Sequence, residues 1–185
     1  MTDEKLIEKI AAKDTSAFEQ LVNKYQTRLY NLVYQLTNAS PDSPDIVQEI
    51  FIKVYEKVSS FKGKSSVYTW LYRLAVNTAL DYLKKVKRKK VVAVENIEKD
   101  FLQRQDNAKT PFEKLRKKEV QDQVRRAISK LPDKYRTVIM LREIEGASYR
   151  EISQILGRSI GTIESRLFRA RVLLQEYLKD FMEEL

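Results

Sequence analysis

Residues 148–171, with the sequence SYREISQILGRSIGTIESRLFRAR, contain the start of one helix, a short turn and the start of a second helix. Ser148 and Glu151 form a capping-box pattern, in which both side chains bond to free amides at a helix N-terminus. Gly157 suits the left-handed conformation that ends many helices, and apolar periodicity resumes at Ile160. The stretch predicts a helix-turn-helix, whose second helix can enter the DNA major groove.

The second helix of this motif carries an unusual solvent face. Helical hairpins of this size also occur without DNA, but glycine there permits close approach and Phe168 suits a thymine methyl or sugar. The alternative is that Phe168 packs beneath the preceding helix of the domain. At 100° per residue, a buried stripe of Ile160, Ile163, Leu167, Ala170, Leu174 and Leu178 leaves Gly161, Ser165, Phe168 and Val172 opposite, bordered by Thr162 and Arg169.

The charge of this helix predicts weak attraction to phosphates. From Ser159 onward, acidic residues outnumber basic ones, so a partner must add affinity for DNA. The acidic residues are Glu164, Glu176, Asp180, Glu183 and Glu184, and the basic ones are Arg166, Arg169, Arg171 and Lys179.

The composition of the whole chain favours an all-α protein that acts on a polyanion. Only four glycines and four prolines occur in 185 residues, and 43% of residues are apolar, enough for two small cores. A net charge of +9 suits nucleic acid or an acidic membrane surface. Cysteine and histidine are absent, which excludes thiol nucleophiles, Cys/His zinc sites and histidine acid–base catalysis. We therefore expect no cofactor, no metal site and no enzymatic activity.

The first half of the chain has the apolar periodicity of four successive helices. The helix after the turn at residues 38–44 directs apolar residues inward and leaves an acidic and amide face, which is unexpected for DNA binding. The expected helices span residues 4–12, 15–36, 44–59 and 68–85, and the outward residues of the third are Asp45, Gln48, Glu49, Lys53 and Glu56.

Aromatic residues lie among cations around the loop at residues 61–66. Such a mixture suits unstacked single-stranded bases, where stacking contributes about 1–3 kcal/mol per base. The alternative is that the aromatic residues belong to the core, which is their more common location. We interpret Trp70 as mainly core, and Phe61 and Tyr72 as mainly contact residues. The cluster comprises Phe61, Tyr68, Trp70 and Tyr72 with Lys62, Lys64, Arg73 and the distal basic run at 84–90.

A boundary between two domains is expected after the basic run at residues 84–90, where six of seven residues are cations. Periodicity fades from Val94 to Pro111, which predicts a flexible linker that permits two arrangements of the domains. The predicted division is a domain at 1–93, a linker at 94–111 and a domain at 112–185. No apolar run of membrane-spanning length or secretory signal occurs, so a soluble cytoplasmic protein is expected.

Five ordered motifs together resemble one known family. They are DIVQEIF at 45–51, FKG at 61–63, YTWLYRLAVN at 68–77, SYREI at 148–152 and GTIESRLFRAR at 161–171. The set resembles the extracytoplasmic-function group of sigma-70 factors, over nearly the whole chain. Within that group it is most similar to the envelope-stress sigma factors, which share the Pro-Asp start before Val-Gln-Glu and the Phe-Arg-Ala-Arg in the last helix.

The resemblance implies a transcription initiation factor that brings core RNA polymerase to promoters, in a stress or envelope response. It implies that the face carrying Asp45, Gln48 and Glu49 binds the clamp helices of polymerase. It also implies an anti-sigma partner, often membrane-anchored, which would hold this cytoplasmic protein at the inner membrane without direct membrane insertion.

The resemblance further implies two promoter surfaces, one in each domain. The first melts and holds the single-stranded non-template minus-10 element, with a flipped base near Phe61, Tyr72 and Asn77. The second reads the double-stranded minus-35 element. The implied minus-10 residues are Phe61, Lys62, Lys64, Tyr72, Arg73 and Asn77, and the implied minus-35 residues are Thr162, Glu164, Ser165, Arg166, Phe168, Arg169 and Arg171.

Two positions depart from the family pattern. Glu164 stands where the family usually has a cation, and Arg158 stands where many members have an apolar residue. Because glutamate accepts a hydrogen bond from cytosine N4, we expect an altered upstream base preference.

Two other functional classes remain open at this point. A stand-alone regulator would bind specific DNA tightly without polymerase, whereas a sigma factor would bind weakly until core polymerase is added. A nucleic-acid enzyme would need a catalytic cluster. Asp42 and Asp45 could bind Mg²⁺ in principle, but no carboxylate spacing singles out a metal site.

Overall fold

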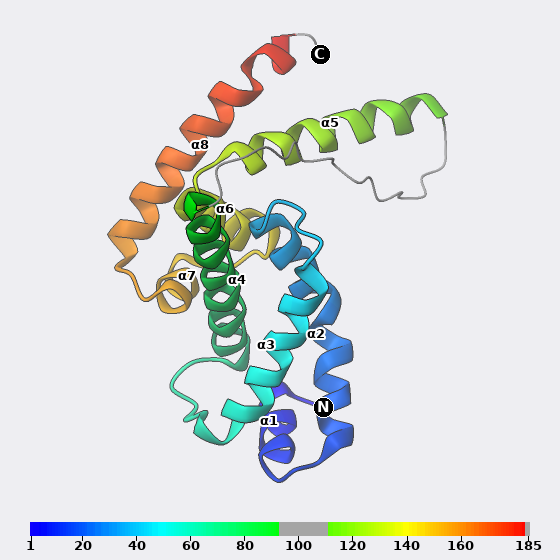
Figure 1. Cartoon of the computed structure of the whole chain (residues 1–185), viewed down its shortest axis with the longest axis vertical. Helices are drawn as coiled ribbons and strands as arrows, with labels where there is room; N and C mark the ends of the chain where they lie inside the picture. Colours follow the sequence, from blue (N-terminus) through cyan, green and yellow to red (C-terminus); the bar gives the residue numbers. More distant parts are fainter. Residues whose placement is uncertain (93–110, 184–185) are drawn as a thin grey trace.

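The computed structural model describes residues 1–92 and 111–183, with helical side chains described for 1–89, 118–179, 181 and 183. Every regular element in these ranges is helical, which confirms the all-α prediction (Figure 1). The predicted linker lies outside the described residues, except for Pro111, where α5 begins. The elements are α1 Asp3–Ala11, α2 Thr15–Leu36, α3 Ser43–Lys57, the 3-10 turn η1 Val58–Ser60, α4 Val67–Val92, α5 Pro111–Lys130, α6 Asp133–Ile139, the π-helical η2 Met140–Ile144, α7 Tyr149–Leu156 and α8 Ile160–Glu183.

Side-chain caps begin several of these helices. The Asp14 carboxylate accepts a hydrogen bond from the Ala17 amide at 3.1 Å at the start of α2. At the start of α7, Ser148 and Glu151 form both hydrogen bonds of the predicted capping box. Gly157 then ends α7 with a φ of +60°, a left-handed conformation that glycine adopts without steric cost. The helix-turn-helix is therefore present at the predicted residues.

Helices α1–α4 form the first core, with α2 at its centre. The apolar stripe of α2 packs against α1, α3 and α4, and each partner contributes its own buried stripe. Fully buried residues of this core include Ile10, Leu21, Leu29, Leu32, Leu36, Ile50, Val54, Leu71 and Ala75.

Helices α5–α8 form the second core, around α6 and the inner face of α8. The stripe predicted on α8 is buried at Ile163, Leu167 and Ala170. The prediction was wrong for Ile160, whose side chain is 45% exposed. This residue is the first of the helix, so it lies beyond the edge of the core that the following turns cover.

Helix α4 is longer than predicted, because it continues past Lys85 to Val92. Lysine and arginine are good helix formers, and no glycine or proline occurs between Gly63 and Pro111. The basic run at 84–90 therefore lies within α4, which extends the helix beyond the predicted end at Lys85.

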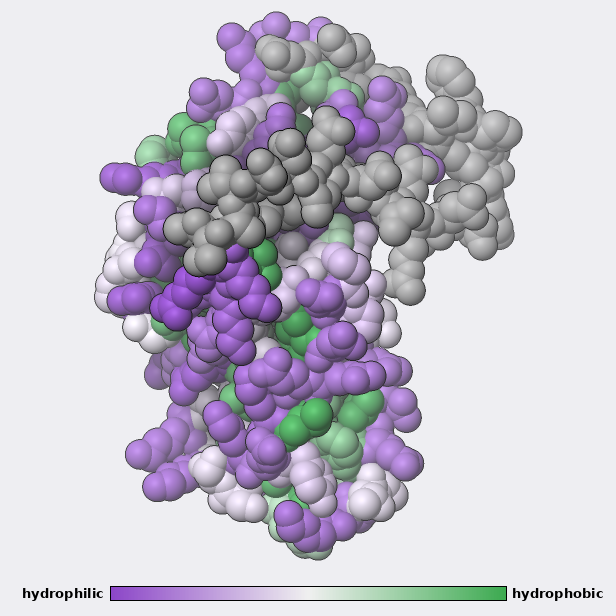
Figure 2. Space-filling view, in the orientation of Figure 1, coloured by the Kyte–Doolittle hydropathy of each residue, from purple (hydrophilic) through white to green (hydrophobic). Residues whose placement is uncertain are grey.

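The two helical domains pack against each other in this structure. Figure 1 shows α4 running from the first domain toward α6 and α7, and α4 contacts α7 while α2 contacts α6 and η2. Hydrophilic residues cover most of the surface in Figure 2, with small groups of apolar residues between them. The contacts between the domains therefore determine which of the predicted DNA-binding and polymerase-binding surfaces are exposed to solvent.

Candidate nucleic-acid and protein interfaces

The outer face of α8 carries exposed apolar side chains. Phe168 is 69% exposed and Val172 is 47% exposed, although both are large and apolar. The alternative that Phe168 packs beneath another helix is therefore wrong. Gly161 and Ser165 are exposed beside them, as the helical periodicity predicted, and Glu164 is exposed as well.

Four of the predicted minus-35 residues line one shallow hollow of about 170 Å³ between α6 and α8. The Arg169 guanidinium hydrogen-bonds the Tyr135 phenol and lowers the pKa of that group. The Ser159 and Thr162 hydroxyls lie 2.8 Å apart, so the start of α8 is held in a fixed geometry. The lining residues are Lys134, Tyr135, Thr162, Ser165, Arg166 and Arg169.

Arg171 lies outside this hollow. Its guanidinium lies 2.7 Å from the carboxylate of Glu143, and this bond raises the pKa of Arg171. Glu164 is exposed one helical turn before Phe168. The predicted upstream set therefore forms a cluster around the hollow, with Glu164, Phe168 and Arg171 along the outer face of α8.

The aromatic residues of the first domain are arranged differently from our interpretation. Phe61 is half-buried and packs against Trp70, with ring centroids 5.3 Å apart. Trp70 is half-buried and packs against the core, as interpreted, whereas Tyr72 is fully buried in this packed arrangement and is not open as a contact residue here. Tyr72 shares the inner face of α4 with Val76 and Ala79, and the second domain covers its hydroxyl group.

The covering residue is Glu145, which lies in the turn between η2 and α7. Its Oε2 atom accepts a hydrogen bond from the Tyr72 hydroxyl at 2.5 Å and one from Arg28 at 3.2 Å. The Glu145 side chain is only 5% exposed. Burial, together with the hydrogen bond and charge of Glu145, raises the pKa of the Tyr72 phenol. These three side chains form a polar cluster between the domains, which we call the Glu145 cluster.

Three further polar contacts join the domains. Arg73 Nε donates to the carbonyl of Gln154 at 3.0 Å, and Lys87 Nζ lies 2.5 Å from Asp133. The buried Arg136 guanidinium donates to the Leu36 carbonyl at 2.8 Å. Of the predicted minus-10 residues, Tyr72 and Arg73 are thus engaged by the second domain.

Three of the other predicted minus-10 residues are open to solvent, whereas Phe61 is half-buried. Lys62 and Lys64 are exposed in the loop before α4, and Asn77 is exposed on the same helix as Arg73. The expected cations are therefore in place around the loop, while the tyrosine at their centre is covered.

The predicted polymerase-binding residues lie on one exposed face of α3. Asp45, Gln48 and Glu49 are all exposed, and the Glu49 carboxylate lies 2.6 Å from Lys53 Nζ. Ile52 lies among them with 57% of its side chain exposed. An apolar residue ringed by polar ones is the arrangement of an interface core and its rim, so this face is compatible with a protein interface.

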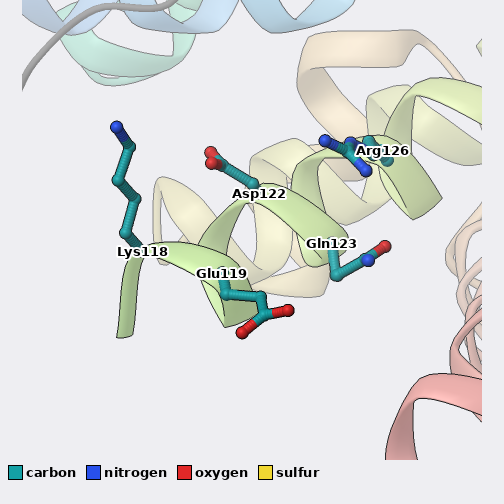
Figure 3. A pocket seen from close by; sticks show the side chains of 5 residues that line it. All are labelled: Lys118, Glu119, Asp122, Gln123 and Arg126. Carbon is teal, nitrogen blue, oxygen red and sulfur yellow. The ribbon is translucent and has the colours of Figure 1, made fainter. Parts of the chain in front are cut away.

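The described residues hold no cluster of metal ligands, and a second hollow belongs to a single helix. No group of three acidic side chains in the described ranges is placed to hold a metal ion. One hollow on α5 is lined by side chains of that helix alone (Figure 3), namely Lys118, Glu119, Asp122, Gln123 and Arg126. No described helix is long and apolar enough to span a membrane.

Sequence reasoning missed three residues of these surfaces. Glu145 and Arg28 became apparent only from the packing of the domains. Ile52 could have been found, because its position breaks the polar outer face of α3.

Known protein families match the chain over two separate stretches. The family described as Sigma-70 region 2 matches residues 21–89, and the family described as Sigma-70, region 4 matches residues 121–174. The chain is 37% identical over 186 residues to the ECF RNA polymerase sigma-E factor of Haemophilus influenzae, covering 98% of both chains. It is 40% identical over 177 residues to the protein of that name from Escherichia coli, covering 92% of this chain and 91% of the relative.

A solved structure with a similar fold is the sigma factor RpoE in complex with the anti-sigma factor NepR from Bartonella quintana. Its TM-score to this chain is 0.72 at 26% identity, covering 88% of this chain and 96% of the other. The chain therefore belongs to the extracytoplasmic-function group of sigma-70 RNA polymerase sigma factors, and it is a transcription initiation factor, not an enzyme.

Proposed function

We propose that the two domains divide promoter recognition between the outer face of α8 and the exposed face of α4. The observation that carries this proposal is the exposed Phe168 beside a basic hollow, on the second helix of the helix-turn-helix. Phe168 and the hollow read the minus-35 element in the major groove. The residues assigned to this element are Thr162, Glu164, Ser165, Arg166, Phe168, Arg169 and Arg171.

The first domain engages the melted minus-10 element and core polymerase through separate surfaces. Cations around the loop attract the non-template strand, and aromatic residues stack on its bases. The exposed face of α3 is left free to bind polymerase, through Asp45, Gln48 and Glu49 around Ile52. The residues assigned to the minus-10 element are Phe61, Lys62, Lys64, Tyr72, Arg73 and Asn77.

The packed arrangement of the domains is a resting form in this proposal. Tyr72 reaches single-stranded DNA only after the Glu145 cluster separates, and Arg73 must leave Gln154. Polymerase favours the open form by binding both domains at a distance from each other. An anti-sigma protein, like the partner in the Bartonella complex, would bind the packed form in the cytoplasm. If that partner is membrane-anchored, it holds the chain at the inner membrane.

Reactivity of promoter thymines to permanganate tests the minus-10 assignment. In complexes with core polymerase, Asn77→Ala reduces thymine reactivity in the minus-10 element, because the exposed amide no longer holds an unpaired base. Asn31→Ala makes the same change on the exposed face of α2 and serves as the control. Normal reactivity with Asn77→Ala would remove this residue from the minus-10 surface.

A further inference from the structure

The basic end of α4 is a strongly charged surface that lies outside the residues assigned above to the two promoter elements. Lys84, Lys85, Lys87, Arg88 and Lys89 are all exposed on the last turns of this helix. Lys84 pairs with Asp81 at 2.9 Å, and Lys87 pairs with Asp133. Lys85, Arg88 and Lys89 form no ion pair with an acidic residue in the described ranges. The net charge of this end is therefore positive and open to solvent.

Four exposed side chains of α4 lie in one line along the helix. Arg73, Asn77, Lys84 and Arg88 are separated by 4, 7 and 4 residues. At 3.6 residues per turn, these spacings keep all four within about 60° of one another around the helix axis. Lys85 and Lys89 lie on another side, at about 120° and 160° from Arg73 on the same geometry. We call the aligned residues Arg73, Asn77, Lys84 and Arg88 the α4 stripe.

The direction of the α4 stripe follows from the order of the domains. The chain passes from the end of α4 to the second domain, which reads the upstream element in the proposed function. The basic end of the helix therefore points upstream of the minus-10 element. Arg88 lies about 16 Å beyond Asn77 along the helix, which is the length of about five base pairs.

We propose that Lys84 and Arg88 bind backbone phosphates of the double-stranded spacer immediately upstream of the minus-10 element. This inference rests on the proposed function, because it continues the minus-10 surface along the same helix face. Two cations spaced one helical turn apart can follow a backbone without reading bases. The contact compensates for the weak phosphate attraction of the acidic α8.

The salt dependence of binding tests this proposal with a matched pair of double variants. Lys84→Ala with Arg88→Ala removes the stripe cations, and Lys85→Ala with Lys89→Ala removes two exposed cations from the other side of the same helix. Each variant is assembled with core RNA polymerase, and binding is measured on a full promoter duplex between 50 and 200 mM salt. A second probe ends its duplex at the upstream edge of the minus-10 element.

The logarithm of the DNA-binding constant falls linearly with the logarithm of the salt concentration. Loss of two phosphate contacts makes this slope less steep by about 1.8. Over this fourfold change in salt, wild-type affinity then falls about 12-fold more than that of the stripe variant. The off-stripe variant keeps the wild-type slope, and all three proteins behave alike on the shortened probe.

Equal effects of both double variants, or an effect that persists on the shortened probe, would overturn the proposal. A loss that matches weaker binding to core polymerase, measured by fluorescence titration, would assign the stripe to a protein surface and would also overturn it. If the wild-type holoenzyme starts no transcripts at all, the proposed function itself fails, which is distinct from either outcome.

Discussion

The hydroxyl oxygen of Tyr72 lies 2.5 Å from the Glu145 carboxylate, although the two residues are 73 positions apart in the chain. Arg28 donates to the same carboxylate, so one acidic side chain from the second domain holds two residues of the first. The bond closes the centre of the proposed minus-10 surface. Its strength therefore sets part of the cost of opening the protein for promoter binding.

Replacing Glu145 with glutamine tests this relationship. A hydrogen bond to a charged group contributes about 1.5–3 kcal/mol, so Glu145→Gln shifts the balance of packed and open forms by about 10-fold or more. Small-angle scattering of the free protein should show a larger radius of gyration. Glu143→Gln is the matched control, because Glu143 bonds to Arg171 within its own domain. Unchanged scattering from Glu145→Gln would mean that other contacts hold the domains together.

Alanine substitutions at the neighbouring residues Phe168 and Leu167 distinguish a DNA-reading role from a structural role on α8. Phe168→Ala should weaken holoenzyme binding to promoters with a minus-35 element and leave thermal stability nearly unchanged, because the side chain is 69% exposed. Leu167→Ala should cost about 2–5 kcal/mol of unfolding free energy, because Leu167 is buried. Promoter titrations and thermal melts measure both effects. Wild-type promoter affinity in Phe168→Ala would contradict the assignment of α8.

The exposed Ile52 should contribute to polymerase binding. Ile52→Ala should reduce affinity for core polymerase by more than 1 kcal/mol, as truncation of a central apolar interface residue does, without changing the fold. Ile160→Ala removes an isoleucine that is 45% exposed in the second domain and serves as the control. Fluorescence titration with core polymerase measures the difference. Equal affinities of the two variants would argue against α3 as the contact surface.

The acidic Glu164 should shape the upstream base preference. Glu164→Arg should increase binding to generic promoter DNA and change the preferred minus-35 bases, because arginine favours guanine where glutamate accepts from cytosine. Glu176→Arg makes the same change of charge farther along α8, at another exposed position. It should increase generic binding alone. A screen of promoter variants that shows no change of base preference for Glu164→Arg would exclude a reading role.

Local signals in the sequence predicted most of the fold. Ser148, Glu151 and Gly157 act through bonds and dihedral angles within a few residues, so their pattern determined the helix-turn-helix. The end of α4 was placed too early, because a run of like charges can lie in a helix or outside one. Lysine and arginine are good helix formers, and no glycine or proline follows Lys85 to end the helix before Pro111.

The burial of Tyr72 could not be predicted, because it depends on a contact between the domains. Periodicity reports which side of a helix is apolar, but Tyr72 carries both an apolar ring and a hydroxyl group. Only the position of Glu145, 73 residues away, decides whether that hydroxyl is covered. The exposure of Phe168, by contrast, followed directly from its angle relative to Leu167 on α8.

Run-off transcription on sheared genomic DNA tests whether the chain directs core RNA polymerase to promoters. The purified chain and core RNA polymerase are supplied separately and together, and transcripts are resolved by length. Discrete transcripts should appear only when both are present, and they should start downstream of shared minus-35 and minus-10 sequences. Sequence-specific DNA binding by the chain alone, with no discrete transcripts when polymerase is added, would contradict it.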